Sequence, residues 1–89
     1  MEFEWDPDKA DSNLRKHDVS FDEAATAFAD PLSSTIPDPD HFTEEDRFVL
    51  MGETYYGRLV VVVFIERGER FRIISARLAT RRERRSYEG

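Results

Sequence analysis

The stretch LVVVVFI at residues 59–65 limits the possible folds of this chain more than any other part of its sequence. Successive side chains of a β-strand point to opposite faces of the sheet, and this run is apolar at both sets of alternating positions. A strand with that pattern is buried on both faces. We therefore expect residues 59–65 to lie in the middle of a sheet, with another element covering each face.

Two further strand-like runs flank this one, at 47–56 and 70–78. Gly57 and Gly68 stand in the short joints between the runs, where hairpin turns favour glycine, so an antiparallel meander is predicted. Segment 32–36 is expected to be a short edge strand, and FEWD near the start a brief strand or an anchored arm. Regular pleating of the third run would place Phe71, Ile73, Ser75 and Arg77 on one face and Arg72, Ile74, Ala76 and Leu78 on the other.

Helix signals precede the meander. Asp6 followed by Pro7 is a favourable start for a helix over residues 7–17. A second helix is predicted over residues 20–28, where Ser20 and Glu23 have the spacing of a capping box. Its apolar side chains recur at helical spacing and are expected to face a core: Phe21, Ala24, Ala25 and Phe28.

The C-terminal segment TRRERRSYE predicts a third, short helix, with Thr80 and Glu83 as its capping box. The whole order is a strand, two helices, three or four antiparallel strands and a C-terminal helix. We therefore predict one α+β domain over residues 1–89, in which helices pack on a meander sheet.

The amino-acid composition excludes several kinds of site and several classes of protein. The 89 residues include no cysteine, which excludes disulfides and thiolate metal sites. No apolar run approaches the ~20 residues that span a bilayer, and the acidic, aromatic start is unlike a signal peptide. The expectation is a small soluble cytoplasmic domain with no membrane contact, no metal and no cofactor.

Charge is distributed unevenly along the chain, whose net charge is −6. Residues 1–45 carry three basic and thirteen acidic groups, whereas residues 46–89 carry ten arginines and six acids. Such asymmetry is a hint of a polyanionic or acidic partner, and arginine suits phosphate or carboxylate, although a GC-rich genome would also favour arginine codons. The acidic segment 37–46 is expected to be a mobile loop in which His41 is solvated.

Four arginines lie near the start of the C-terminal helix, where the helix dipole disfavours cations. An external anion would offset that cost, so the cluster is interpreted as facing a ligand, either RNA phosphate or acidic segments of a protein partner. Ordinary solvation is the alternative. The cluster comprises Arg81, Arg82, Arg84 and Arg85.

Two groups of motifs, FEWD…K…N…KH.VSF.EA…F.DP and R.ISAR.AT..ER..Y, occur here in order over nearly the whole chain. In these motifs the chain resembles the BrnT family of ribonuclease toxins from type II toxin–antitoxin modules. The resemblance implies a RelE-like fold and a metal-independent endoribonuclease that inhibits translation. It also implies neutralisation by a cognate ribbon–helix–helix antitoxin of the BrnA type, through which the complex binds operator DNA and represses its own operon.

Two positions depart from the family pattern. Asp18 stands where glycine is usual, and is expected to adopt an unusual backbone conformation that aspartate tolerates. Leu78 stands where a lysine is usual, so a basic side chain is lost. This second departure keeps a rival hypothesis open: a catalytically weakened, toxin-like binding module that acts through antitoxin binding and operon regulation. A small interaction domain unrelated to toxins is the third.

RNA cleavage without a metal needs a base for the 2′-hydroxyl, an acid for the 5′-oxygen and cations at the phosphate. His17, Arg47 and Arg77 are the candidate catalytic residues. The alternative roles are a helix cap for His17 and, for Arg77, a structural ion pair with an acid such as Asp6 or Glu4. Candidate RNA-binding residues are Lys9, Lys16, Arg81, Arg82 and Arg85, whereas Arg58 and Arg67 are expected to be solvated.

Overall fold

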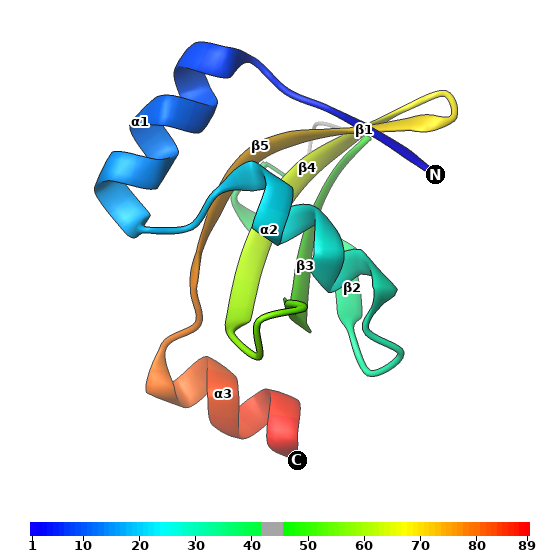
Figure 1. Ribbon diagram of the computed structural model, residues 1–89. Coiled ribbons are helices and arrows are strands. Elements are labelled where there is room, and N and C mark those ends of the chain that lie inside the picture. The colour runs from blue at the N-terminus through cyan, green and yellow to red at the C-terminus, as the bar shows by residue number, and fades with distance from the viewer. Residues whose placement is uncertain (42–45) are drawn as a thin grey trace.

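The computed structural model describes residues 1–41 and 46–89 (Figure 1). Five strands form one sheet in the order β1-β5-β4-β3-β2. The strands are β1 (Glu2–Glu4), β2 (Ser34–Pro37), β3 (Arg47–Glu53), β4 (Leu59–Arg67) and β5 (Arg70–Leu78). The helices are α1 (Pro7–His17), α2 (Phe21–Thr26) and α3 (Arg81–Glu88), with 3₁₀ turns η1 (Ala27–Ala29) and η2 (Pro39–His41).

The α+β prediction is confirmed, and so are the main strand positions. β4 lies at the centre of the sheet and pairs antiparallel with β3 and β5. β2 forms an edge, as expected for segment 32–36. β1 occupies the other edge and pairs with β5 in parallel, so the sheet is mixed rather than a pure antiparallel meander. No helix of the described residues is long and apolar enough to cross a membrane.

The N-terminal helices α1 and α2 cover one face of the sheet. Val60, Val62 and Phe64 of β4 are buried there with Phe21 and Ala24 of α2. Aromatic rings pack against this core, with centroid distances of 4.9 Å for Phe3–Phe28, 4.9 Å for Phe28–Phe64 and 5.0 Å for Phe64–Phe71. Edge-to-face and tilted ring contacts of this kind add to the stabilisation from apolar burial.

A bulge in β5 changes which side chains reach this core. Val63 pairs with Ser75, but Phe64 pairs with Ile73, so Ile74 is an extra residue without a partner on β4. Both Ile73 and Ala76 are consequently buried on the helix side, while Ser75 lies on the opposite face. The prediction of regular pleating is therefore wrong, because a bulge inverts the alternation beyond it.

Asn13 fastens α1 to β5 just beyond the bulge. Its side-chain amide donates to the carbonyl oxygens of Ala76 (2.8 Å) and Val19 (3.0 Å), and its oxygen accepts from the Ala76 N–H (3.1 Å). β1 pairs with β5 only at Arg70 to Arg72 and does not reach Ala76. The buried Asn13 amide therefore makes the hydrogen bonds at Ala76 that a neighbouring strand would otherwise make. Buried backbone groups need such partners, and here one side chain supplies three hydrogen bonds.

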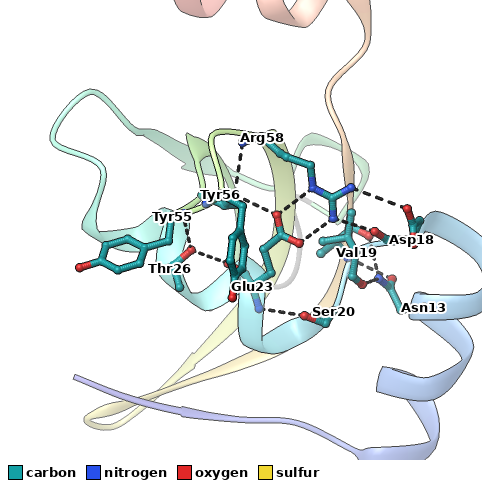
Figure 2. A network of polar contacts seen from close by, with 11 residues as sticks. Asn13, Asp18, Val19, Ser20, Glu23, Thr26, Tyr55, Tyr56 and Arg58 are labelled. Carbon is teal, nitrogen blue, oxygen red and sulfur yellow. Dashed lines mark hydrogen bonds and ion pairs between the residues drawn. The ribbon is translucent and has the colours of Figure 1, made fainter.

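A second polar cluster joins α2 to the β3–β4 turn (Figure 2). Arg58 donates to the Glu23 carboxylate at 2.6 and 2.8 Å and to the backbone oxygen of Asp18 at 2.7 Å. The expectation that Arg58 is solvated is wrong. The Ser20 hydroxyl accepts from the Glu23 N–H, but the Glu23 side chain turns to Arg58 and Thr54, so only half of the predicted capping box forms.

Asp18 has the left-handed conformation expected for the glycine position of the family pattern, with φ 57°. It forms the C-cap of α1, and its N–H donates to the Leu14 carbonyl oxygen. A short polar residue tolerates this region better than most, so aspartate ends the helix where glycine is usual.

The acidic segment 37–46 is only partly as predicted. Residues 42–45 lie outside the described residues, so the expected mobility of that part is untested. The described part begins with the end of β2 and forms the 3₁₀ turn η2. Asp38 is buried, and its side chain lies 3.2 Å from His41, whose own side chain is 42% exposed. The prediction that His41 is solvated is therefore only partly right, because one side of the ring is held by Asp38.

Candidate functional site

The open face of the sheet, opposite α1 and α2, contains a cavity of ≈ 360 Å³. Its floor is formed by apolar and small side chains of β3, β4 and β5, including Val63 and Ser75. Charged side chains from four elements of the chain line it. They are Asp38, Asp40 and His41 from η2 and the residue before it, Arg47 from β3, Arg77 from β5 and Glu83 from α3.

Arg77 and Glu83 form one wall of this cavity. Two parallel hydrogen bonds, at 2.8 and 2.9 Å, join the guanidinium group to the carboxylate, and Arg77 also donates to the Leu78 carbonyl oxygen. These hydrogen bonds lower the pKa of Glu83 to about 2 and raise the pKa of Arg77. An ion pair for Arg77 was one of the alternatives, but its partner is Glu83 rather than Asp6 or Glu4.

Asp38 organises the opposite wall. One carboxylate oxygen accepts from Arg47 Nε at 3.1 Å and lies 3.2 Å from His41 Nδ1, while the other accepts from the Asp40 N–H at 3.0 Å. Burial raises the pKa of Asp38, but the hydrogen bonds from Asp40, Arg47 and His41 outweigh it and hold the pKa below its ordinary value. An ionised carboxylate therefore fixes a guanidinium and an imidazole at the edge of one cavity.

The cavity continues toward α3 as an apolar groove of ≈ 320 Å³. Val49, Val61 and Glu83 line both hollows, so the two form one trough along the open face. Ile36 and Met51 extend the apolar side of the groove toward the β2 edge. The trough therefore combines a charged end with an apolar end.

His17 lies elsewhere. It lines a shallow hollow of ≈ 210 Å³ together with Lys9 and Lys16, on the other side of β5. The structure thus brings together the two lysines and the histidine predicted from the sequence, but in a separate hollow from Arg47 and Arg77. Ser75 lines both hollows and marks where they meet. No side-chain hydrogen bond of His17 is recorded among residues 1–41 and 46–89, which gives no support to its role as a helix cap.

The arginines of α3 do not line the cavity, the groove or the hollow beside His17. The predicted capping box of Thr80 and Glu83 is present, and Tyr87 donates a hydrogen bond to Asp30. Glu83 and Tyr87 hold one side of α3 against the domain. The four arginines are exposed and remain available to a partner: Arg81, Arg82, Arg84 and Arg85.

Asp38 and His41 are site residues that sequence reasoning missed. Both stand in a segment whose prolines and acids are typical of solvated loops. The sequence feature that could have indicated this site is the spacing of Asp38 and His41, three residues apart, with Arg47 following at the start of a strand. With that spacing, the Asp38 carboxylate can contact both His41 and Arg47 only if the loop folds back onto the strand. It does so here, since the Asp38 N–H donates to the Arg47 carbonyl oxygen at 3.0 Å.

The arrangement suits binding of an anionic substrate and transfer of a proton beside it. Two guanidinium groups flank a hollow that also offers an imidazole, which is the combination needed to hold a phosphate and move a proton beside it. The described residues contain no group of three or more His, Asp or Glu side chains placed to bind a metal ion.

The chain is similar to known proteins both in sequence and in fold. Residues 5–83 match the family model described as ribonuclease toxin, BrnT, of type II toxin-antitoxin system. The fold is similar to the crystal structure of the Brucella abortus ribonuclease toxin BrnT, with a TM-score of 0.71 and 26% sequence identity. That match covers 91% of this chain and 99% of the Brucella chain. Comparison with curated protein sequences finds no match.

Proposed function

Because the chain belongs to the BrnT family of ribonuclease toxins of type II toxin–antitoxin systems, we propose that it is a metal-independent endoribonuclease that inhibits translation. Neutralisation by a cognate antitoxin is part of the same proposal. The observation that carries it is the trough on the open face, where Arg47 and Arg77 come from distant segments to one cavity.

The trough would hold the scissile phosphodiester between the two arginines. The 2′-oxygen attacks phosphorus as a base takes its proton, a P–O2′ bond forms, the P–O5′ bond breaks, and the departing 5′-oxygen takes up a proton. Guanidinium groups stabilise the charge that builds on the phosphorane oxygens. The products are a 2′,3′-cyclic phosphate and a 5′-hydroxyl.

Glu83 affects how Arg77 would meet a phosphate. The carboxylate takes one N–H from each terminal nitrogen of Arg77, while an arginine has five N–H donors in total. A third N–H binds the Leu78 carbonyl oxygen. The remaining two donors support phosphate binding while Glu83 keeps the guanidinium oriented on the cavity wall.

RNA on either side of the phosphate would follow the basic side chains. Lys9, Lys16 and His17 surround the hollow that meets the cavity at Ser75, which supports a phosphate site there and keeps His17 as a candidate acid or base. The exposed cluster of Arg81, Arg82 and Arg85 extends the basic surface on α3. Because the net charge is −6, RNA binding would be confined to such local basic surfaces.

The remaining parts of the proposal concern partners. A ribbon–helix–helix antitoxin of the BrnA type would bind this chain, and operator DNA would be bound only through that antitoxin. Membership of a type II toxin family supports an antitoxin partner. Action in the cytoplasm and the RelE-like character of the fold remain predictions of the same kind.

The test is expression of the chain in cells that lack the antitoxin. The parent is expected to stop growth with loss of RNA, and Arg77→Ala is expected to abolish both while the protein stays folded. Arg72→Ala is the matched control, because Arg72 is also an ion-paired arginine of β5 (3.0 Å to Glu4) but lines none of the hollows described above.

RNA from the arrested cells and circular dichroism of both purified variants provide the measurements. Normal growth with the parent protein would overturn the ribonuclease proposal. Equal toxicity of parent and Arg77→Ala would leave Arg77 as a purely structural residue that fastens α3.

The second candidate function is a catalytically weakened module that binds antitoxin and regulates the operon. Two observations favour it: Arg77 is already neutralised by Glu83, and Leu78 replaces the usual lysine beside the site with an exposed apolar side chain. Normal growth of expressing cells together with an intact toxin–antitoxin complex would support this candidate over the enzyme.

A further inference from the structure

His41 has the position of a proton-transfer group. It lines the same cavity as Arg47 and Arg77, and its side chain is 42% exposed, so a substrate in that cavity can reach it. His17, the histidine suggested by the sequence, lies in the neighbouring hollow without an arginine.

The His41 ring is held at one nitrogen. Nδ1 is 3.2 Å from a carboxylate oxygen of Asp38, whose side chain is 5% exposed. A carboxylate only accepts, so Nδ1 carries the hydrogen and Nε2 of the neutral ring is left as an acceptor. The carboxylate would also stabilise the positive charge that the ring gains when Nε2 takes a proton, as in other carboxylate–histidine pairs.

The turn that carries this pair is itself fastened to the sheet. The Asp38 N–H donates to the Arg47 carbonyl oxygen at 3.0 Å, and the His41 N–H donates to the Asp38 carbonyl oxygen at 3.1 Å. Arg47 Nε shares the carboxylate oxygen that His41 contacts. One buried carboxylate thus holds both the imidazole and a guanidinium group at the edge of the same cavity, which supports their acting on one phosphodiester.

We infer that His41 is the general base of the proposed ribonuclease, positioned by Asp38. This inference rests on the proposed function. Nε2 takes the proton of the 2′-hydroxyl as the 2′-oxygen bonds to phosphorus, and the P–O5′ bond breaks. The departing 5′-oxygen takes a proton from solvent water, and the imidazolium then gives its proton to the hydroxide that remains. The other charged groups lining the cavity from β5, α3 and η2 are Arg77, Glu83 and Asp40.

The experiment compares cleavage of two RNA oligonucleotides by purified parent protein and by His41→Asn. One substrate is ordinary RNA, and the other has sulfur in place of the 5′-oxygen at one linkage, so that its leaving group needs no proton. Asparagine keeps a donor for Asp38, which preserves the fold. Loss of one proton transfer is expected to slow cleavage by about 10²–10⁴-fold, equally for both substrates.

Glu69→Gln is the control, since Glu69 is an exposed residue of the β4–β5 turn and lines none of the hollows described above. A folded His41→Asn protein that cleaves ordinary RNA within about tenfold of the parent would overturn the inference. So would a loss that disappears with the sulfur substrate, because that result assigns an acid. If the parent itself cleaves neither substrate, the proposed ribonuclease function is overturned as well. An active parent with an active His41→Asn variant overturns only the assignment of His41.

The positioning role of Asp38 is tested by a double-mutant cycle. Asp38→Asn is expected to lower kcat more in the parent than in the His41→Asn background, because the two residues act as a unit. Equal losses in both backgrounds would mean that Asp38 acts only through Arg47 or the fold, and would overturn its assignment to His41.

Discussion

The two faces of the sheet are closed by different kinds of interaction. On the helix side, apolar side chains of α2 and β4 interlock, and the buried polar groups there are fully paired, as Asn13 shows with its three hydrogen bonds. On the open side, α3 is held by the Arg77–Glu83 pair and by Tyr87, and a trough remains beside it. Close packing makes one face stable, whereas ion pairs hold the other in place and leave room for a ligand.

The largest expected effect is on the sealed face. Asn13→Ala leaves backbone groups of Ala76 and Val19 without their partners, and should lower the free energy of unfolding by roughly 2–4 kcal/mol. Urea denaturation measures the change. Ser12→Ala is the control, since it makes the same gain in helix propensity at an exposed neighbour. An unfolding free energy for Asn13→Ala equal to that of Ser12→Ala would mean that water replaces the amide at no cost.

The sharpest comparison uses two adjacent valines of β4. Val62 is fully buried on the helix side, whereas Val63 lines the cavity. Val62→Ala should destabilise the fold by about 2 kcal/mol, and Val63→Ala by less than about 1 kcal/mol, because the second deletion enlarges a space that already exists. Thermal unfolding of both variants checks this, and equal losses would contradict the contrast between the faces.

The smallest expected effect depends on pH. The pKa of Glu83 is lowered to about 2, so its stabilising contribution is present above its ordinary value near 4.5 and is lost as the pH falls through 2. Since Arg77 is 42% exposed, solvent screening reduces the contribution to about 1 kcal/mol. The difference in unfolding free energy between the parent and Glu83→Gln should therefore shrink between pH 5 and pH 2. Glu69→Gln is the control, and a constant difference would argue against the ion pair.

Much of the fold could be predicted from local patterns. Alternation and apolar runs placed the meander, and capping residues such as Asp6 and Thr80 placed the helix starts, because these signals depend on neighbours in sequence. The parallel pairing of β1 with β5 could not be predicted in this way. It depends on the path of α1 and α2 between the paired segments, which no short motif specifies.

The candidate site was predicted less well, for a physical reason. Arg47 and Arg77 were chosen by residue type and do line one cavity, but their partners were missed. Asp38 is charged and sits between prolines, which predicts exposure, yet its backbone and side-chain contacts with Arg47 bury it. Such burial depends on how a loop returns to the sheet, a tertiary effect that residue spacing permits but does not determine.

The extra residue at Ile74 has a consequence for comparing relatives of this chain. Odd-numbered side chains before Ile74 and odd-numbered side chains after it point to opposite faces of the sheet, and the same holds for even-numbered ones. A homologue of equal length without the bulge would carry the counterpart of Arg77 on the side of the helices, whereas a homologue lacking the extra residue would keep it in the trough. In an alignment with such a shorter homologue, a gap placed at Ile74 keeps its arginine in register with Arg77, and a gap placed after Arg77 would match that arginine with a residue of the opposite face.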